Sequence, residues 1–524
     1  MARLLTILAV LAVVAGACAG TPSSTTGGGT SPAPSAAAKP TYGGTVTFVL
    51  ENDVVDFDPL KSRAFVDRNI YYQIYDSLVR IDETGKIIPW LATKWEPSTD
   101  GKSVTFTLRD DVTYHDGTKF DADSVKWNIE RYIKTTGSQR AGELSSVDTV
   151  EVVNPTTVKF NLKSPFSPLV ANLVDRASMM VSRKAFEAIG NPDDFTRKAF
   201  KAGSGPFMIT EAIKDDHMTL EKNPSWWGKD KDGNKLPYLD KITVKPITNS
   251  DTRFTNLRTG DAQVSNNISG KDVPTARNES SLTYQERPAL SFRSLIPNRA
   301  PGFVFNDKRY VKAVSLAIDR AQLLDKGYFN LGAVGYGTIA PAHFAFDPSF
   351  KPFEKADPEG AKKLVQEVGK PLSFELLVPA GDPATLTIAT LIKDQLQKAD
   401  IVADLQQLEF AKILELQSAR TFKGLTFVGW SGRIDPDGNT YDHIYTKRPF
   451  NDSSYSNAEV DKLLDEQRAT SDQDKRKTAL RKAEQIYVVD DPARIWLGFG
   501  AAQLLTSKKV NAPPIYPDQI IRFQ

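Results

Sequence analysis

A single cysteine, Cys18, occurs in the whole chain of 524 residues, so no internal disulfide can hold this fold together. The rest of the composition is typical of a globular protein, with 40% hydrophobic and 25% charged residues. A chain of this length is expected to form roughly two to four domains. The sequence therefore indicates a large multidomain body without a disulfide framework.

The position of Cys18 indicates where the protein resides. Arg3 precedes an apolar stretch, 4–15, which has the length of a secretory signal core and is shorter than the roughly 20 residues that span a bilayer. The run Ala-Gly-Ala-Cys at 15–18 resembles a bacterial lipobox, in which the cysteine is acylated, although Ala15 stands where leucine or valine is more common. We expect residues 1–18 to be a lipoprotein signal and Cys18 to be the lipidation site. The alternative is an ordinary secretory signal.

The segment that follows is predicted to be a tether. Residues 19–40 consist almost entirely of Thr, Ser, Gly, Pro and Ala, with Lys39 as the only charge. Such a segment cannot bury enough apolar surface to offset its ordering entropy, so we expect it to be disordered and the folded part to begin near Thr41. No later segment is long and apolar enough to cross a membrane, so we expect the lipid to be the only membrane contact.

Charge and histidine spacing exclude several classes of partner. The 66 basic residues nearly balance the 64 acidic ones, so we expect no nucleic-acid partner. The histidines, His115, His217, His343 and His443, are scattered without metal-ligand spacing. The sequence predicts no metal site and no cofactor.

Periodicity predicts a mixture of strands and helices. Apolar residues alternate with polar ones at 44–50 and 102–109, which is typical of strands. Apolar residues recur at helical spacing from 310 to 324, and 456–459 has the spacing of a capping box before another helix. Because there is no strict alternation of strand and helix, the chain is expected to be an α/β or mixed multidomain protein.

Motifs for catalysis are incomplete. The run Gly-Trp-Ser-Gly at 429–432 resembles a nucleophile elbow until Arg433, where a glycine is needed. The run at 335–340 loosely fits a dinucleotide fingerprint, but Pro341 disfavours the helix that should follow. We therefore predict that the protein is not an enzyme.

Other motifs point to a family. They are Pro-Trp-Leu-Ala-Thr-Lys-Trp-Glu-Pro at 89–97, Tyr-His-Asp-Gly-Thr at 114–118, Gly-Ser-Gly-Pro-Phe at 203–207, Asn-Pro-Ser-Trp-Trp-Gly at 223–228 and Ala-Ile-Asp-Arg at 317–320. In this order they closely resemble the bacterial extracellular solute-binding proteins of family 5, which feed peptide, nickel and opine ABC importers. The resemblance covers essentially the whole chain after the tether.

The resemblance implies an α/β fold of the periplasmic-binding-protein type (type II, cluster C), with two lobes and an extra inserted domain. It places the boundaries of the first lobe at 41–80, 203–300 and 497–524, the inserted domain at 81–202 and the second lobe at 301–496. A small solute would enter the cleft between the lobes, which close by hinge motion. The implied protein is a monomeric substrate-binding lipoprotein on the outer face of the cytoplasmic membrane, which delivers a peptide-like or acidic solute to an ABC permease and ATPase complex.

The family alignment singles out one arginine. In peptide-binding members, a segment after a Gly-Trp pair carries an acid that binds the peptide ammonium group; here Arg433 stands in that place after Gly429 and Trp430. An arginine suits a carboxylate or phosphate, which favours an acidic solute. Alternatively, Arg433 pairs internally with Asp435 or Asp437, and Asp435 is also compatible with a shifted ammonium anchor.

The remaining candidates for ligand contact are weaker. Trp430 and Ser431 adjoin Arg433, Asn52 follows the first strand, and Tyr441 is a candidate for the rim of the cleft. Arg293 is interpreted either as a second anion anchor or as part of a hinge salt bridge, and the salt bridge is favoured. The alternative functions are a receptor for oligosaccharides or metal chelates, and a sensor that reports ligand occupancy to a signalling partner.

Overall fold

The computed structural model of the protein describes residues 41–523. The predicted signal (1–18), the tether (19–40) and the lipidation site Cys18 lie outside the described residues. Strands and helices are mixed along the described chain, as the periodicity predicts.

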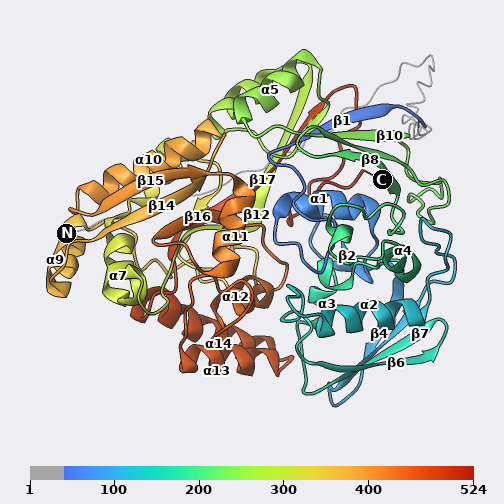
Figure 1. The fold of residues 1–524 in the computed structure, drawn as a ribbon, viewed down its shortest axis with the longest axis horizontal. Helices are drawn as coiled ribbons and strands as arrows, with labels where there is room; N and C mark the ends of the chain where they lie inside the picture. The colour runs from blue at the N-terminus through green and yellow to red at the C-terminus, as the bar shows by residue number, and fades with distance from the viewer. Residues whose placement is uncertain (1–40, 524) are drawn as a thin grey trace, which may run out of the picture. The chain divides into compact units, whose positions relative to one another are not determined.

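An 11-stranded sheet runs through the described residues, in the order β15-β14-β16-β12-β17-β11-β1-β10-β9-β8, with β13 on β17 (Figure 1). The strands are β15 (Val402–Leu408), β14 (Ser373–Pro379), β16 (Leu425–Trp430), β12 (Leu282–Pro297), β17 (Ile495–Ser507), β11 (Val264–Ser265), β1 (Thr45–Leu50), β10 (Lys241–Pro246), β9 (His217–Lys222), β8 (Phe207–Ile213) and β13 (Ala333–Val334).

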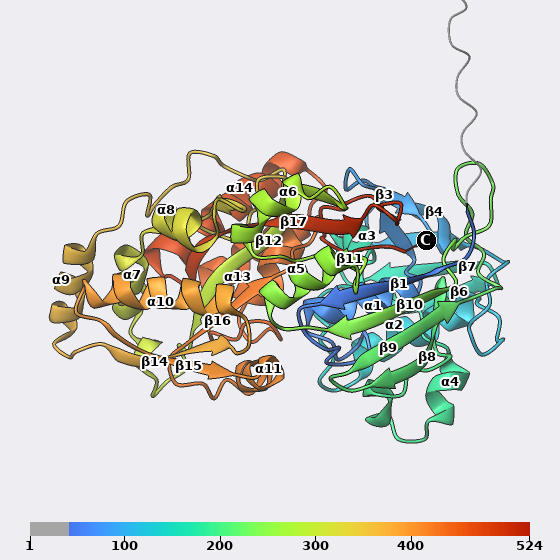
Figure 2. The same cartoon turned by 90° about the horizontal axis from the view of Figure 1, so that it is seen from above.

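Two long antiparallel strands, β12 and β17, cross the middle of this sheet. β12 pairs with β17 from Leu282 to Leu295 and with β16 from Phe292 to Pro297, while β17 also pairs with β11. Figure 2 shows β1, β8, β9 and β10 at one end of the two strands and β14, β15 and β16 at the other. We call these ends, with the helices packed on them, the β1 side and the β14 side.

Helices accompany the strands at both ends of the sheet. The helices that precede β12 in the chain are α1 (Phe65–Ile74), α2 (Ala122–Lys134), α3 (Leu169–Asn172), α4 (Arg183–Ala188), α5 (Ser250–Thr259) and α6 (Val273–Asn278). Those of the β14 side are α7 (Lys308–Ala317), α8 (Arg320–Gln322), α9 (Pro358–Val368), α10 (Pro383–Gln397), α11 (Phe410–Ala419), α12 (Pro436–Ile444), α13 (Ala458–Arg468) and α14 (Gln473–Gln485).

A second sheet has four strands in the order β4-β5-β7-β6, and α2 packs against it (Figure 1). These strands are β4 (Ala92–Pro97), β5 (Ser103–Leu108), β7 (Thr157–Leu162) and β6 (Val147–Asn154); the separate hairpin is β2 (Val79–Ile81) and β3 (Ile87–Pro89). The hydrophobic core of the four-stranded sheet is distinct from the cores of the β1 side and the β14 side. The domain boundaries at 80, 202, 300 and 496 stay predictions.

The alternation predicted for the first strand is confirmed. Val46, Phe48 and Leu50 of β1 are buried, whereas Thr45 is exposed and Thr47 is half-buried. β5 repeats the pattern with Val104, Phe106 and Leu108 buried. In β5 one face joins a hydrophobic core, and in β1 the alternating face does so while Val49 of the opposite face joins a second core. The alternating face is the feature that a period of two predicts.

The continuous helix predicted over 310–324 is wrong. α7 ends at Ala317, Ile318 is extended with ψ 118°, and Asp319 caps α8 by accepting from the backbone N of Gln322 at 2.8 Å. The Gln395 side chain contacts both the N and the O of Asp319, which fixes the break. The prediction failed because the helical spacing of apolar residues continues past Ile318, where the backbone leaves the helix.

The predicted capping box before α13 is off by one residue. Asn457, not Ser456, is the N-cap, and its side chain accepts from the backbone N atoms of Glu459 and Val460 at 3.1 and 3.2 Å. Asparagine is as good an N-cap as serine, so the helix start is retained although the capping residue differs.

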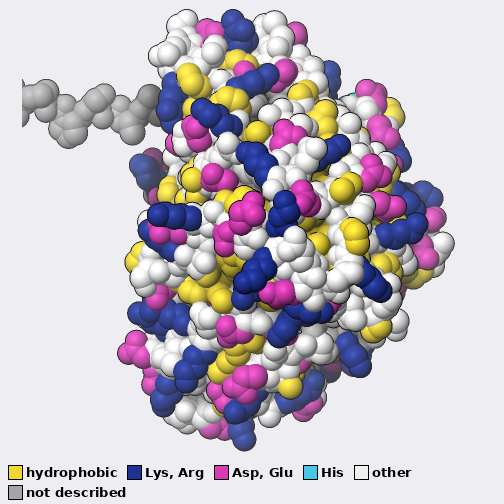
Figure 3. Space-filling view, turned by 90° about the vertical axis from the view of Figure 1, so that its left-hand side faces the viewer, with side chains coloured by type: hydrophobic (Ala, Val, Ile, Leu, Met, Phe, Trp, Pro, Cys, Tyr) yellow, Lys and Arg dark blue, Asp and Glu magenta, His cyan; other side chains and the backbone are white. Residues whose placement is uncertain are grey.

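The surface is mixed in charge. On the face drawn in Figure 3, Lys and Arg side chains are interspersed with Asp and Glu side chains. None of the helices within 41–523 combines the length and apolar character that crossing a membrane requires.

Candidate functional site

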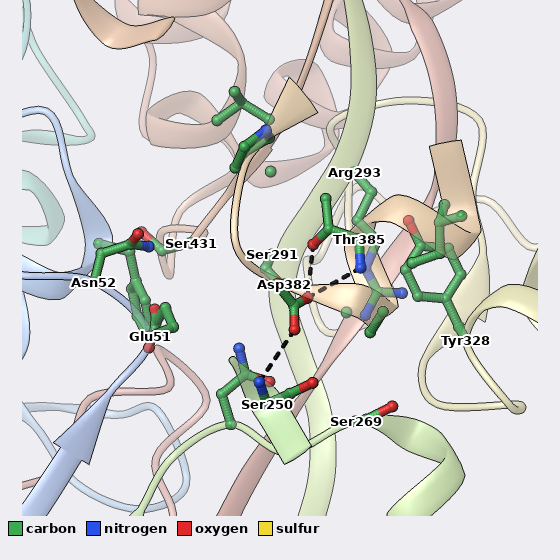
Figure 4. Close-up of a pocket in the computed structure, with 18 of the residues that line it drawn as sticks. Glu51, Asn52, Ser250, Ser269, Ser291, Arg293, Tyr328, Asp382, Thr385 and Ser431 are labelled. Carbon is green, nitrogen blue, oxygen red and sulfur yellow. Dashed lines mark hydrogen bonds between the residues drawn. The ribbon is translucent and has the colours of Figure 1, made fainter. Parts of the chain in front are cut away.

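A cavity of about 380 Å³ lies where β12 and β17 pass between the β1 side and the β14 side (Figure 4). Residues after β1 and around α5 form one wall, and residues at the start of α10 and on β16 form another. The floor comes from the crossing strands, through Ser291, Phe292 and Arg293 of β12 and Gly500 and Ala501 of β17. The volume is within the range of about 300–1,000 Å³ that is typical of small-molecule sites.

The crossing strands are irregular at this cavity. The β12–β17 register shifts between Pro288 and Phe292, and again between Arg293 and Ser294. Irregularities of this kind bend a strand and redirect its side chains. The break in the ladder therefore coincides with the residues that line the cavity.

The β1 wall carries an acid with one carboxylate oxygen that lacks a hydrogen-bond partner. Glu51 follows β1 directly, and its Oε2 is buried and unpartnered within the described residues. Burial raises the pKa of Glu51, although the charge of Arg253 opposes this. Arg253 itself donates to the backbone carbonyls of Ile247, Thr248 and Asn267.

The facing wall begins at Asp382, the N-cap of α10. Its carboxylate accepts from the N and Oγ1 of Thr385 at 3.0 and 2.8 Å, and from the N of Ser250 on the β1 side at 3.3 Å. Although burial raises it, the hydrogen bonds from Ser250 and Thr385 hold the pKa of Asp382 below its usual value. Asp382 thus links the two walls across the cavity (Figure 4).

Arg293 enters the cavity from β12. Its Nη1 donates to the carbonyls of Leu331 and Phe499, both at 3.3 Å, and its guanidinium carbon lies 3.9 Å from the centre of the Tyr328 ring. Burial lowers the pKa of Arg293. Within residues 41–523 no carboxylate lies within ion-pair distance of Arg293, so the favoured hinge salt bridge is wrong.

Three of the predicted site residues line the cavity: Asn52, Trp430 and Ser431. Ser431 accepts a hydrogen bond at 2.7 Å from Nη1 of Arg68, a buried arginine of α1. Trp430 ends β16. Asn52 comes from the β1 side and Ser431 from the β14 side, and the fold brings both to one cavity (Figure 4).

Arg433 lies outside the cavity lining. Its Nη2 is 3.4 Å from Oδ2 of Asp175, its Nη1 donates to the Gly432 carbonyl at 2.8 Å, and it covers the Trp430 ring at 4.5 Å. Arg68 pairs with the same carboxylate at 2.8 Å. Burial lowers the pKa of Arg433 to about 10, although Asp175 opposes this. We call Arg68, Asp175 and Arg433 the Asp175 cluster.

The predicted internal partners of Arg433 are occupied by other arginines. Asp435 caps α12 and pairs with Arg476 at 2.7 Å, and Asp437 pairs with Arg468 at 2.7 Å. An internal ion pair exists, but the predicted partner is wrong, because Asp175 comes from a distant part of the chain.

Tyr441 is buried in α12, where its hydroxyl donates to Asp465 at 3.1 Å and accepts from Arg448 at 3.0 Å. Neither it nor Asp435 lines the cavity. The ligand-binding roles of Arg433, Asp435 and Tyr441 stay predictions.

Sequence reasoning missed Glu51, Tyr328 and Asp382. The end of the first strand predicts Asn52 as a contact, and the structure adds its neighbour Glu51 to the lining. Asp382 precedes Pro383, a pattern that predicts a helix start without indicating what the helix faces. No local pattern distinguishes Tyr328.

No group of three or more His, Cys, Asp or Glu side chains within the described part of the chain is arranged to hold a metal ion.

Comparisons with known proteins agree with one family. The family described as "Bacterial extracellular solute-binding proteins, family 5 Middle" matches residues 86–452. The chain is 25% identical over 494 residues to the glutathione-binding protein GsiB of Salmonella paratyphi A, covering 91% of this chain and 93% of that protein.

Solved structures share the fold. The periplasmic binding protein DppA from Helicobacter pylori, in complex with the peptide STSA, matches with a TM-score of 0.83 at 24% identity, over 92% of this chain and 98% of that one. The binding protein AgaA from A. tumefaciens R10, in complex with agropinic acid, matches with a TM-score of 0.82 at 23% identity, over 92% and 96%. The predicted fold class is confirmed.

Proposed function

Because the chain belongs to the bacterial extracellular solute-binding proteins, family 5, we propose that it is the substrate-binding component of an ABC importer. The observation that carries the proposal is the cavity between the β1 side and the β14 side, whose floor is made by the two strands that join them. The solute would be held there and passed to a permease and ATPase complex. We propose no catalytic activity.

The proposed mechanism is closure around the solute. The β1 side and the β14 side would move about β12 and β17, where the ladder is already interrupted. Contacts made by the β14 side support a closed form: its Asp452 is held by Arg63 through two bonds of 2.8 and 2.9 Å. Its Arg433 meets Asp175, whose neighbours Val174 and Ala177 pack in the core of the second sheet. A solute that binds the closed form better than the open form shifts the population towards it.

We propose that Asn52, Trp430 and Ser431 contact the solute. Arg433, Asp435 and Tyr441 would instead act through their neighbours. Arg433 would stabilise closure through Asp175, and the other two would fix α12 through the pairs with Arg476 and Asp465. The lobe boundaries 41–80, 203–300 and 497–524, 81–202, and 301–496 belong to this proposal.

The proposed location is the outer face of the cytoplasmic membrane, with Cys18 acylated and residues 19–40 acting as a tether. The protein would work as a monomer beside its permease. The support is the sequence of residues 1–40 together with the family membership. Labelling with a radioactive fatty acid in wild type and in Cys18→Ser tests the anchor, and incorporation in both would contradict it.

We infer a peptide-like or acidic solute. A relative named for glutathione and similar folds solved with the peptide STSA and with agropinic acid support this class. A thermal-shift screen of the full chain tests it with peptides, glutathione, opines, organic acids, sugars and metal chelates. A solute at 100 times its Kd adds about 2.7 kcal/mol of stability. Stabilisation by peptides or acids is expected, whereas a response to sugars or chelates alone, or to none, would contradict a peptide-like or acidic solute.

A further inference from the structure

The arginines that line the cavity differ in what they contact. Arg63 is neutralised by Asp452, to which it donates twice, and it also contacts Ser418 at 3.0 Å. Arg253 is 2% exposed and donates to backbone carbonyls of its own side. Arg293 is the remaining arginine of the lining, and no carboxylate neutralises it within the described chain.

The orientation of Arg293 leaves one edge of the guanidinium open. Both of its hydrogen bonds use Nη1, to the carbonyls of Leu331 and Phe499. The edge formed by Nε and Nη2, which can donate two parallel bonds to a carboxylate, has no hydrogen-bond partner within residues 41–523. Tyr328 covers the face of the group at 3.9 Å, so the plane is held while the edge is unused.

Glycines keep the surroundings of this guanidinium clear. A Cβ on Gly332 would lie 3.1 Å from Nη1 of Arg293 and 2.3 Å from the carbonyl oxygen of Phe499. A Cβ on Gly500 would lie 2.2 Å from Oγ of Ser291 and 3.8 Å from Nη2 of Arg293. A side chain at Gly332 would crowd the guanidinium itself, and one at Gly500 would displace Ser291 beside it.

The acids of the cavity do not neutralise Arg293. Figure 4 shows Glu51 across the cavity from Arg293 and Tyr328, while Asp382 is directed to Ser250 and Thr385. A partly buried cation without a counter-ion is costly, and a solute anion placed on the open edge would remove that cost. Neutral solutes would leave it in place.

We propose that Arg293 is the anion anchor of the cavity and that the solute carries a carboxylate bound side-on to its Nε and Nη2. The inference rests on the proposed receptor function and adds the charge of the solute to it. It assigns the selection of acids to the strand that crosses between the two sides, rather than to the segment after Gly429 and Trp430.

Calorimetry with matched solutes tests the anchor. The probes are trialanine and glutathione, each compared with the carboxamide in which every carboxylate is replaced by a neutral amide. Wild type is expected to bind at least one acid about tenfold to a hundredfold more tightly than its amide, because a hydrogen-bonded charge is recognised. Equal affinity for acid and amide, or binding of neither acid, would overturn the proposal.

Variants of Arg293 assign the effect to the residue. Arg293→Met, which keeps the aliphatic stem, is expected to lose the preference for the acid, and Arg293→Lys is expected to retain part of it because a point charge replaces a two-bond edge. The control is Arg258→Gln, which removes the charge of an exposed arginine of α5 and should bind the solutes as wild type does. Full preference in Arg293→Met would overturn the proposal; if that variant does not fold, full preference in Arg293→Lys would overturn the two-bond geometry.

The failure of the anchor is distinguishable from the failure of the receptor function. If amides or sugars bind with measurable affinity while acids have no advantage, the receptor function stands and the anchor is wrong. If no solute of the wider screen binds, both are wrong.

Discussion

Arg293 and Arg433 are two arginines of similar setting and different availability. Each lies against an aromatic ring, Tyr328 at 3.9 Å and Trp430 at 4.5 Å, and burial lowers the pKa of each. Arg433 forms an ion pair with Asp175, whereas no carboxylate within residues 41–523 lies within ion-pair distance of Arg293. An arginine of this fold is therefore available to a solute only where no acid of the chain pairs with it.

The Asp175 cluster predicts the largest effect on stability. Burial alone would raise the pKa of Asp175, but Arg68 and Arg433 hold it well below its usual value. Its stabilising contribution is therefore complete above the unfolded pKa and is lost as the pH falls through the folded one. Asp175→Asn is expected to lower the free energy of unfolding at pH 7 by about 3–5 kcal/mol, measured by urea denaturation, because Arg433 loses its ion-pair partner and Arg68 keeps only the longer pair with Asp518 at 3.8 Å.

The control for this change is Asp193→Asn, which removes an exposed acid paired with Lys61 at 2.6 Å. It should leave the urea midpoint unchanged. If Asp175→Asn behaves as the control does, the Asp175 cluster is not what distinguishes Arg433 from Arg293.

Asp442 is a buried acid whose pKa is shifted in the opposite direction from that of Asp175. Burial raises the pKa of Asp442 to about 6, although Arg468 opposes this, and its Oδ1 has no hydrogen-bond partner within 41–523. The folded state therefore binds an extra proton, so the penalty of ionising Asp442 is present above about pH 6 and absent below about pH 4. Asp442→Asn is expected to raise the free energy of unfolding at pH 8 by on the order of 2 kcal/mol and to change nothing at pH 4.

Urea denaturation at the two pH values measures this change. A variant that is less stable than wild type at pH 8 would show that the folded state stabilises the ionised carboxylate of Asp442, which is the opposite of a raised pKa.

Crowding beside Arg293 predicts a smaller effect, on binding. In Gly500→Ala, the added Cβ would force the Ser291 hydroxyl to move, since the two would be 2.2 Å apart. The affinity for an acidic solute is expected to fall by a factor of about three to ten, or about 1 kcal/mol, in calorimetry. The double variant Gly500→Ala, Ser291→Ala removes the clash and should recover most of the loss; no recovery would mean that Ser291 is not the cause.

Much of the fold was predictable, because local apolar patterns indicate the strands and because the sequence motifs occur in the same order as in the family. The burial of Val46, Phe48 and Leu50 followed from alternation, and the family motifs predicted the fold class that the comparisons confirm. The break at Ile318 was missed, because it depends on Gln395 in another helix, which no spacing near residue 318 reveals.

The site was predictable as a place but not as a set of contacts. The Gly429–Trp430 motif pointed to the right region, since Trp430 and Ser431 line the cavity. The available arginine, however, is across the ladder: Arg293 pairs in register with Gly429 on the neighbouring strand. Neither this register nor the approach of Asp175 to Arg433 can be read along the chain.

Arg293, and not Arg433, is expected to discriminate between a charged and a neutral solute. The decisive measurement is the ratio of the Kd of trialanine amide to that of trialanine, determined by calorimetry in Arg433→Met and Arg293→Met. The account predicts that Arg433→Met weakens acid and amide alike through poorer closure and keeps the wild-type ratio, whereas Arg293→Met brings the ratio to about one. A ratio lost in Arg433→Met and kept in Arg293→Met would contradict it.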